Sequence, residues 1–437
     1  MSTPSPSAYF LWELTTPTAP RLVGELRKLS NGDVSFQYDA SWLPNGYALS
    51  PDLPLSTQEY PAIHRRMRDK AAPGAVDDAR PDSWGEKVIR YLHMPRGNHL
   101  IDYLYFAGDD RFGALGVSSS ITAYQPFPTP ALARLEDAAA ISETAKIIQL
   151  GGHLTAQQRT LASGNASLGG AKPKALVRID DQEWVLKLYN GEPFDLPLAE
   201  HATMTLAQKC GIKVAITLPV PLPGEHALVV QRFDRAGGKR IHCISAATVL
   251  RAETPPGETP VYGYPHLARA IRRNGDSQTV RLQLLDLFRR MVFNILIANT
   301  DDHEKNHAFL VSTKGSGTAL ALSPAYDIVT SGNGAFAHEF LISEDSPEPL
   351  LANAMDVCAQ FDLSPQAARH EIQAVIHVVN GWRDHFRGHG ITERDIEELA
   401  NFIDDADLLA QRKNFAAAPL ARVKAQKRQG PFANQAL

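Results

Sequence analysis

The polar segment Asn299–Asn306 constrains the fold more than any other part of the sequence. It follows Arg281–Ala298, where apolar residues recur with the period of an amphipathic helix. The segment itself is rich in residues that favour turns, so the helix is expected to end there. Two apolar runs follow, His307–Val311 and Ala319–Leu322, with a turn at Gly315–Gly317 between them. The sequence therefore predicts a core helix, a polar loop and a β-hairpin in succession.

Three residues of this region have the side chains that phosphoryl transfer requires. Asp301 and Asn306 have the D-x-x-x-x-N spacing with which protein kinases place a catalytic carboxylate and a metal-binding amide. Asp327 follows the predicted hairpin, where kinases have a second metal-binding carboxylate. Any one of these aspartates alone is typical of a turn or a helix cap. Together they predict that Asp301 accepts the proton of an attacking hydroxyl and that Asn306 and Asp327 hold Mg²⁺.

The same loop contains the pattern H-E-x-x-H from His303 to His307, which is found in zinc proteases. That chemistry requires both histidines on one face of a continuous helix. The turn-forming residues before His303 and the strand-like residues from His307 onwards argue against such a helix. A metalloprotease is therefore an alternative rather than the main prediction.

The residues upstream of this loop supply candidates for nucleotide binding. The small-residue loop Ser163–Ala171 has many backbone N–H groups that can approach phosphate oxygens, although it matches neither common phosphate-loop pattern. Lys187 lies among apolar residues in a predicted strand, where a buried ammonium needs a partner. An ATP phosphate and Glu200, in the following helix, are the candidate partners. The strand that ends near Phe233 is expected to cross between two lobes, with Gln231 and Phe233 facing adenine.

The remaining patterns predict an α+β protein in three parts. Hairpin-type turns at Asn31-Gly32 and Asn45-Gly46 punctuate the first part, and Pro126–Pro130 marks its end. We predict a β-rich N-terminal subdomain at 1–125, a mixed nucleotide-binding lobe at 126–260 and a helical C-terminal lobe with the catalytic loop at 261–437. In the first part, strands are expected at Leu22–Leu29, Val34–Tyr38, Tyr47–Leu49, Tyr103–Ala107 and Gly113–Ser118.

The composition excludes several classes of protein. The 437 residues, 44% hydrophobic and 21% charged, are typical of a globular protein of two or three lobes. The net charge of -4 gives no general attraction to nucleic acid or membrane, and the basic residues from Arg412 to Arg428 are interpreted as a solvated face. Three cysteines without CxxC spacing indicate a reducing compartment. Since neither a secretory signal nor a membrane-spanning apolar run is recognisable, a cytoplasmic protein is expected.

These parts, in this order, resemble the HipA family of toxin kinases over most of the chain. The similar segments are Arg111–Leu115, Ser167–Lys174, Val185–Leu188, Gln231–Arg235, Thr300–Asn306 and Ser323–Ile328. The sequence departs from the family pattern at Pro81–Gly85 and at Lys172-Pro173, which indicates a divergent branch.

The resemblance implies a bilobal protein-kinase-like fold with a β-rich N-terminal subdomain and an all-helical C-terminal lobe. It implies an ATP- and Mg²⁺-dependent Ser/Thr kinase that phosphorylates a protein, in known members an aminoacyl-tRNA synthetase. It also implies a helix-turn-helix antitoxin that binds operator DNA. Ser167 would become autophosphorylated, with Ser163 as the nearest alternative, and His303 would support the catalytic loop. The phosphate loop would contribute Ser167, Gly169, Gly170 and Ala171 to the nucleotide site.

Two further functions stay open at the level of sequence. A small-molecule kinase on a related bilobal fold would share Asp301, Asn306 and Asp327 with a protein kinase. A non-catalytic regulator or DNA-complex scaffold would have no need of these three residues together with Lys187.

Overall fold

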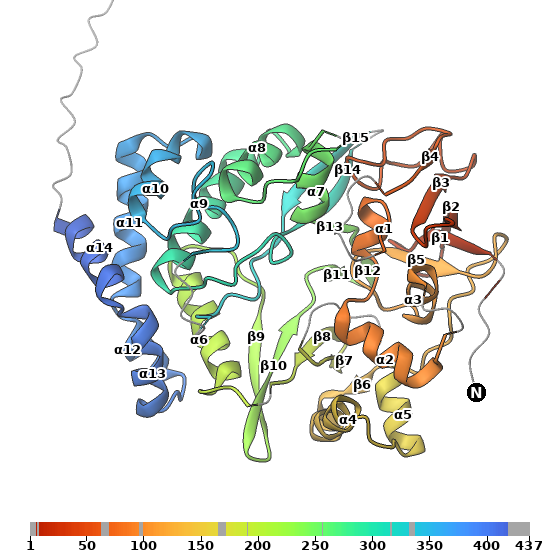
Figure 1. The fold of residues 1–437 in the computed structure, drawn as a ribbon, viewed down its shortest axis with the longest axis horizontal. Coiled ribbons are helices and arrows are strands. Elements are labelled where there is room, and N and C mark those ends of the chain that lie inside the picture. Colours follow the sequence, from red (N-terminus) through yellow and green to blue (C-terminus); the bar gives the residue numbers. More distant parts are fainter. Residues whose placement is uncertain are drawn as a thin grey trace, which may run out of the picture.

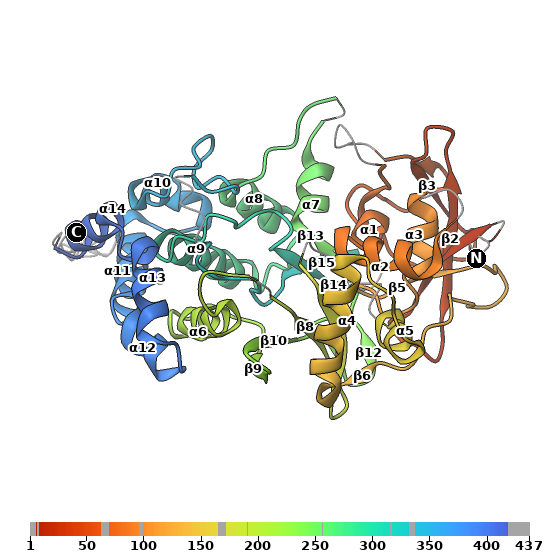
Figure 2. The same cartoon turned by 60° about the horizontal axis from the view of Figure 1, so that its bottom comes forward.

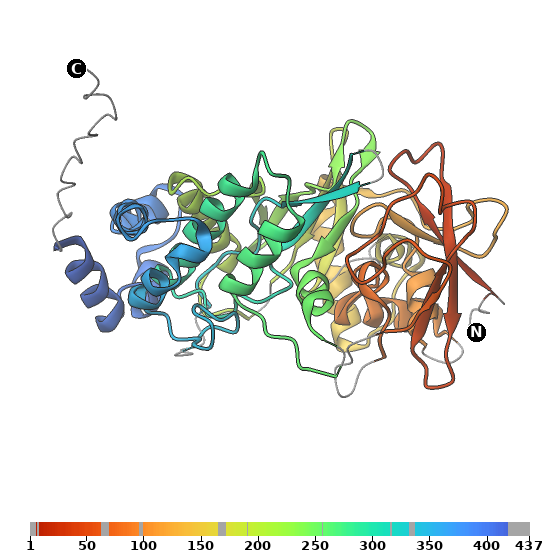
Figure 3. The ribbon, with the colours of Figure 1, turned by 90° about the horizontal axis from the view of Figure 1, so that it is seen from above.

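The chain forms an elongated molecule in which sequence order follows the long axis. The N-terminal sheet lies at one end and the C-terminal helices at the other, with the remaining sheets and helices between them (Figures 1 and 3). The computed structural model describes residues 6, 8–62, 70–95, 99–164, 172–189, 191–255, 257–314, 317–331 and 337–417.

The N-terminal part is built on an antiparallel sheet with the strand order β4-β3-β2-β1-β5. The predicted turn at Asn31-Gly32 is confirmed, and Gly32 has the positive φ of 85° that such a turn requires. The strand predicted at Tyr47–Leu49 is wrong. Leu49 is fully buried, but its N–H donates to the Tyr38 hydroxyl rather than to a ladder. The strands are β1 Tyr9–Glu13, β2 Arg21–Lys28, β3 Val34–Tyr38, β4 Glu59–Tyr60 and β5 Leu115–Ser118.

Three helices pack between this sheet and the next part of the chain. The strand predicted at Tyr103–Ala107 is wrong, because these residues belong to a helix that is buried nearly all round. A short, wholly apolar run has no periodicity by which a helix and a strand can be told apart. The helices are α1 Gly74–Asp78, α2 Ser83–His93 and α3 Leu100–Phe106.

The central part contains a sheet of order β6-β7-β8-β10-β9, with helices on both faces. Alternation along β10 shows the two faces: Ala227 and Val229 pack with α2 and α4, whereas Leu228 and Val230 pack with α6. In Figure 2, α4 lies in front of these strands. The elements are β6 Ala133–Arg134, α4 Ala138–Leu150, α5 Ala156–Ser163, β7 Lys174–Ile179, β8 Gln182–Lys187, α6 Leu196–Lys209, β9 Thr217–Leu222 and β10 Glu225–Gln231.

The C-terminal part is helical around the predicted hairpin. The core helix is confirmed as α9 Val280–Leu296, and the hairpin as β14 Ala308–Lys314 and β15 Gly317–Leu322. Short strands β11 Arg235–Ala236, β12 Lys239–Arg240 and β13 Cys243–Ser245 lead into this part, and β13 pairs with β14. The other helices are α7 Ala246–Glu253, α8 Tyr264–Asn274, α10 Leu351–Asp356, α11 Pro365–Val379, α12 Trp382–Gly388, α13 Glu393–Ile403 and α14 Ala406–Ala417.

One basic residue of the C-terminal stretch is buried rather than solvated. Arg412 was expected on a solvated face, but it lies buried in α14, 2.6 Å from Asp404. The other basic residues of that stretch divide between Lys413, which is exposed, and positions beyond 417, which lie outside the described residues. Within the part of the chain that the structure describes, no helix is both long and apolar enough to cross a bilayer.

A buried ionic network fastens the N-terminal subdomain to the segment after β10. The Arg232 guanidinium donates to both carboxylate oxygens of Asp234, at 2.9 and 2.8 Å, and to the Arg111 carbonyl at 2.7 Å. The same Asp234 carboxylate accepts from Arg235 at 3.0 Å and from the N–H of Gly113 at 2.7 Å. Burial alone would raise the pKa of Asp234, but Arg232 and Arg235 hold it well below its usual range. The network thus joins charged side chains after β10 to backbone groups at Arg111 and Gly113 of the N-terminal subdomain.

We expect Asp234→Asn to lower the free energy of unfolding by about 3 kcal/mol, because it leaves two buried guanidinium groups with Glu183 as their one remaining shared carboxylate. Urea unfolding followed by tryptophan fluorescence measures this loss. Glu25→Gln is the control, since Glu25 pairs with Arg27 at 2.8 Å on the surface and such pairs contribute at most about 1 kcal/mol. Equal effects of the two substitutions would contradict a structural role for the network.

Candidate active site

One large cleft, of about 870 Å³, lies where the N-terminal helices, the central sheet and the hairpin meet. Its walls come from α1 and α2, from β7, β8 and α6, and from the segments on either side of the hairpin. The described candidates from the sequence converge on it. These are Lys187, Glu200, Gln231, Phe233, Asp301, His303, Asn306 and Asp327.

Lys187 lies between two carboxylates at the inner end of this cleft. Its ammonium donates to Glu200 Oε1 at 2.5 Å and to Asp327 Oδ1 at 2.7 Å. Glu200 is only 1% exposed, and its second oxygen accepts from the hydroxyl of Tyr189. Burial would lower the pKa of the Lys187 ammonium, but Asp327 and Glu200 raise it above the ordinary lysine value. Lys187 therefore remains a cation although it is buried.

Asp327 is held in an unusual backbone conformation directly after the hairpin. Its φ is 59°, in the left-handed region that aspartate tolerates better than most residues. About a third of its side chain is exposed to the cleft. Burial would raise the pKa of its carboxyl, but Lys187 and Lys174 lower it well below the usual range. The carboxylate is thus ionised and available to a cation at neutral pH.

The loop Asn299–Asn306, the candidate catalytic loop, presents its two adjacent aspartates to opposite sides. Asp301 is exposed at the cleft, and its N–H donates to Ser331 Oγ at 2.9 Å. Asp302 is buried and accepts from the Tyr264 hydroxyl at 2.5 Å, while Nε2 of His307 lies 3.2 Å away. The buried contacts fix the loop from behind, so that the Asp301 carboxylate faces solvent.

The remaining loop contacts argue against the zinc-protease alternative. His303 lines the cleft, whereas His307 is 3% exposed and stacks on Phe340 on the inner side. The side chain of Asn306 donates to the carbonyl of Asp301 at 3.4 Å, so the polypeptide turns between the two histidines. Over the described residues, no group of three histidine, cysteine or acidic side chains is arranged to hold a metal ion.

The predicted adenine contacts are only partly available. The N–H of Gln231 donates to the Ile216 carbonyl at 2.8 Å, and the N–H of Arg232 donates to the Glu183 carbonyl at 3.1 Å. Neither donor is therefore free for an adenine edge. Phe233 lines the cleft, with its ring centroid 5.5 Å from that of Tyr326, and it keeps its place as a candidate contact.

Most of the candidate phosphate loop, Ser163–Ala171, lies outside the described residues. Ser167, Gly169, Gly170 and Ala171 lie outside the described residues. Ser163, the alternative acceptor, is the last residue of α5, and its hydroxyl donates to the Arg159 carbonyl at 2.7 Å. In chain order the loop connects the end of α5 to β7, whose first residue pairs with Lys187.

Several residues of the cleft were missed by the sequence analysis. Lys174 begins β7 directly opposite Lys187, and burial lowers the pKa of its ammonium. Its sequence neighbour Lys172 was the available signal, because two lysines that face one cleft suit a polyanionic ligand. Lys305, next to Asn306 in the catalytic loop, lies 3.1 Å from Asp82 of the N-terminal subdomain. No local pattern could have predicted that contact, since it depends on how the subdomain packs.

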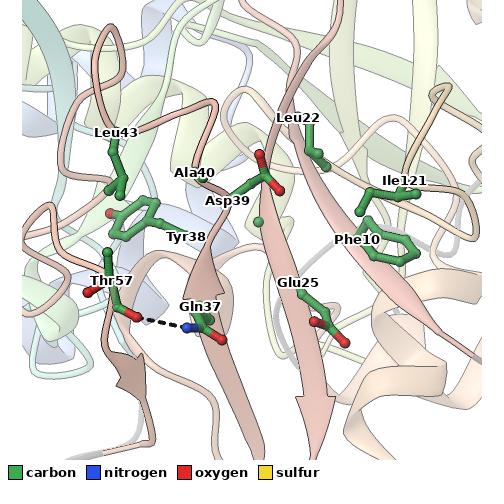
Figure 4. Close-up of a pocket in the computed structure, with 11 residues that line it drawn as sticks. Phe10, Leu22, Glu25, Gln37, Tyr38, Asp39, Ala40, Leu43, Thr57 and Ile121 are labelled. Carbon is green, nitrogen blue, oxygen red and sulfur yellow. Dashed lines mark hydrogen bonds between the residues drawn. The ribbon is translucent and has the colours of Figure 1, made fainter.

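A smaller depression, of about 280 Å³, lies on the outer side of the N-terminal sheet (Figure 4). Phe10, Leu22 and Ile121 lie on one side of it and Tyr38 and Leu43 on the other. Its two carboxylates have partners on the same surface: Asp39 accepts from Ser41, and Glu25 pairs with Arg27. It contains no counterpart of the Lys187 cluster, so the larger cleft is the candidate active site.

A small sheet with a buried lysine–glutamate pair, facing a helical part with an Asp–Asn loop and a second aspartate, defines a bilobal protein-kinase-like fold. Comparison with known proteins assigns the chain to a family. A model described as the HipA-like C-terminal domain matches residues 166–382, and one described as the HipA N-terminal domain matches residues 17–118. The chain belongs to the HipA family.

Individual relatives are distant. The chain is 30% identical to the "Putative kinase Y4dM" of Sinorhizobium fredii over 34% of this chain and 37% of that protein. It is 26% identical to the "Putative kinase Y4mE" of the same organism over 71% and 75% of the two chains. The chain thus spans little more than a third of the first relative. A solved structure of the HipA, HipB and operator DNA complex of Shewanella oneidensis has a TM-score of 0.65, with 17% identity and 93% and 97% coverage, which shows the shared fold.

The charges around Lys187 predict how stability depends on pH. Because the pKa of folded Asp327 is depressed, its carboxylate stabilises the fold above the ordinary carboxyl pKa of about 3.9, and this contribution is lost as the pH falls. We expect the urea midpoint of Asp327→Asn to be below that of the wild type at pH 7. The gap should narrow only as the pH falls below about 3.9 and on towards the depressed pKa of the folded carboxyl. Glu143→Gln, on the exposed side of α4, should follow the wild type throughout. If the urea midpoints of Asp327→Asn and the wild type differed by the same amount at every pH, the depressed pKa of Asp327 would be contradicted.

Proposed function

We propose that the protein is an ATP- and Mg²⁺-dependent Ser/Thr protein kinase. The observation that carries the proposal is the convergence of Lys187, Glu200, Asp301, Asn306 and Asp327 on one cleft. The Lys187–Glu200 pair leaves a fixed cation for the phosphates of ATP, and Lys174 adds a second positive charge nearby. A volume of about 870 Å³ suits one small ligand, such as a nucleotide.

In the proposed reaction, Asp301 accepts the proton of the acceptor hydroxyl as its oxygen attacks the γ-phosphorus. The bond between the γ-phosphorus and the bridging oxygen breaks, and ADP leaves. Lys187 orients the phosphates, and Glu200 keeps Lys187 in place. Oxygen ligands from Asn306 and Asp327 fit Mg²⁺, which prefers few protein ligands with phosphate and water completing its shell and would neutralise phosphate charge. The depressed pKa of Asp327 supports this fit, since an ionised carboxylate is the better ligand.

The exposure of Asp301 supports a macromolecular acceptor. Lys187 is almost buried, whereas Asp301 opens to solvent at the cleft. An acceptor hydroxyl carried by a protein can reach that position without entering an enclosed pocket. We therefore favour a protein substrate, such as an aminoacyl-tRNA synthetase, over a small-molecule substrate. The structural neighbour from Shewanella oneidensis is a complex with HipB and operator DNA, which supports a helix-turn-helix antitoxin, and through it operator DNA, as partners of this chain.

The base assignment predicts the effect of Asp301→Asn. The substitution preserves shape but cannot accept the proton, so phosphoryl transfer should fall by about a hundredfold or more while ATP affinity stays within about twofold. Incubation with Mg-ATP followed by peptide mass spectrometry reads out transfer to Ser167 in the chain itself, and calorimetry reads out ATP affinity. Ser163→Ala should still gain phosphate on Ser167. An Asp301→Asn protein that is phosphorylated at the wild-type rate would disprove the role of this residue.

The metal assignment predicts a link between Mg²⁺ and nucleotide affinity. We expect Mg²⁺ to tighten ATP binding to the wild type, and Asp327→Asn to remove most of this gain, because the substitution replaces a charged oxygen ligand with a neutral amide. Titration calorimetry with ATP in the presence of Mg²⁺ or of EDTA measures both affinities. Equal Mg²⁺ dependence in the two proteins would contradict the assignment of Asp327 as a ligand.

A further inference from the structure

The first turn of α2 contributes an unexpected contact to the active site. Asp82 occupies the N-cap position of α2, where an aspartate usually accepts a hydrogen bond from a backbone N–H of its own helix. Its side chain makes no such capping bond. Instead Oδ1 lies 3.1 Å from the ammonium of Lys305, which is 223 residues further along the chain. The carboxylate thus serves the catalytic loop rather than its own helix.

Lys305 has a fixed backbone and a side chain whose direction depends on this contact. Its N–H donates to Nδ1 of His303 at 3.1 Å, and its carbonyl accepts from the Tyr326 hydroxyl at 2.7 Å. Its side chain lines the same cleft as Asp301. A free lysine side chain samples many rotamers, so one ion pair decides where the charge lies.

The helix that provides Asp82 is itself anchored to the other side of the cleft. Trp84, two residues further on, is 4% exposed and donates from its indole nitrogen to the Lys174 carbonyl at 3.0 Å. Lys174 begins the strand that pairs with β8, opposite Lys187. The first turn of α2 therefore contacts both the central sheet and the candidate catalytic loop. These two contacts fix the position of Asp82.

We propose that Asp82 is a positioning residue, which holds the Lys305 ammonium beside Asp301 so that its charge faces the phosphoryl group during transfer. The inference rests on the proposed kinase function and assigns part of the active site to the N-terminal subdomain. A preorganised cation near developing negative charge accelerates a reaction without needing to bind the ground state more tightly. The loss of Asp82 should therefore change the rate of transfer rather than the affinity for ATP.

The test compares the full-length wild type with Asp82→Asn, Asp82→Glu and Lys305→Met. The initial rate of γ-phosphoryl transfer from radiolabelled Mg-ATP to the chain itself and to water is measured at saturating ATP, and ATP affinity is measured by calorimetry. Asp82→Asn should lower the rate at least about tenfold, with affinity within about twofold of the wild type. Asp82→Glu, which keeps the charge, should recover most of the rate.

A matched ion pair controls for the loss of an ordinary salt bridge. Lys146 and Glu225 lie 2.8 Å apart away from the cleft, with side-chain exposures of 38% and 27%, against 33% and 25% for Lys305 and Asp82. Glu225→Gln should leave both rate and affinity unchanged. In the double variant of Asp82→Asn and Lys305→Met, the rate should be no lower than with Lys305→Met alone, since the two residues act as one unit.

The outcomes separate the two proposals. An Asp82→Asn protein that transfers at the wild-type rate, or whose loss multiplies with that of Lys305→Met, overturns the positioning role and leaves the kinase assignment intact. A wild type that transfers no phosphoryl group from Mg-ATP overturns the kinase assignment, and the positioning role with it.

Discussion

The rest of the structure depends on the ion pairs of the buried Lys187 ammonium with Glu200 and Asp327. A lysine withdrawn from water must have partners, because an unpaired buried charge costs several kcal/mol. Here the partners come from α6 and from the segment after β15, so one charge requires the sheet, the helix beside it and the hairpin to meet at one point. Asp327 meets this requirement with a positive φ of 59°, a backbone conformation that aspartate tolerates better than most residues.

The attachment of the N-terminal subdomain follows a different rule. Arg232 pairs with Asp234, and from the N-terminal subdomain its guanidinium binds a backbone group, the Arg111 carbonyl. The N–H of Gly113 completes the contact, and a Cβ at Gly113 would come within 3.0 Å of the Cys243 backbone nitrogen. A backbone partner depends little on the sequence of the loop that provides it.

The sequence predicted those features that depend on nearby residues. Helix α9 and the hairpin after it are visible as periodic runs, and the Asp301–Asn306 spacing lies within a single loop. Predictions failed where packing decides. The apolar run at Tyr103–Ala107 is buried as a helix with its capping residue. The run predicted as a strand at Tyr47–Leu49 forms no ladder, because the Leu49 N–H donates to the Tyr38 hydroxyl. Asp82 and Lys305 are 223 residues apart in sequence, so only the folded arrangement of the subdomains could show their contact.

Mutations of the two adjacent aspartates in the candidate catalytic loop should have different effects on the protein. Asp301 faces solvent, and among the described residues its carboxylate has no buried partner. Asp302 instead accepts from the hydroxyl of Tyr264 and contacts the ring of His307 in the interior. Under the proposed function, a mutation at codon 301 yields a chain that keeps its fold but lacks the carboxylate proposed as the base. The same mutation one codon later removes the acceptor of the interior groups and exposes the chain to degradation. Alleles that encode a folded but inactive protein should therefore be found with substitutions at codon 301. Substitutions at codon 302 should instead yield little folded protein.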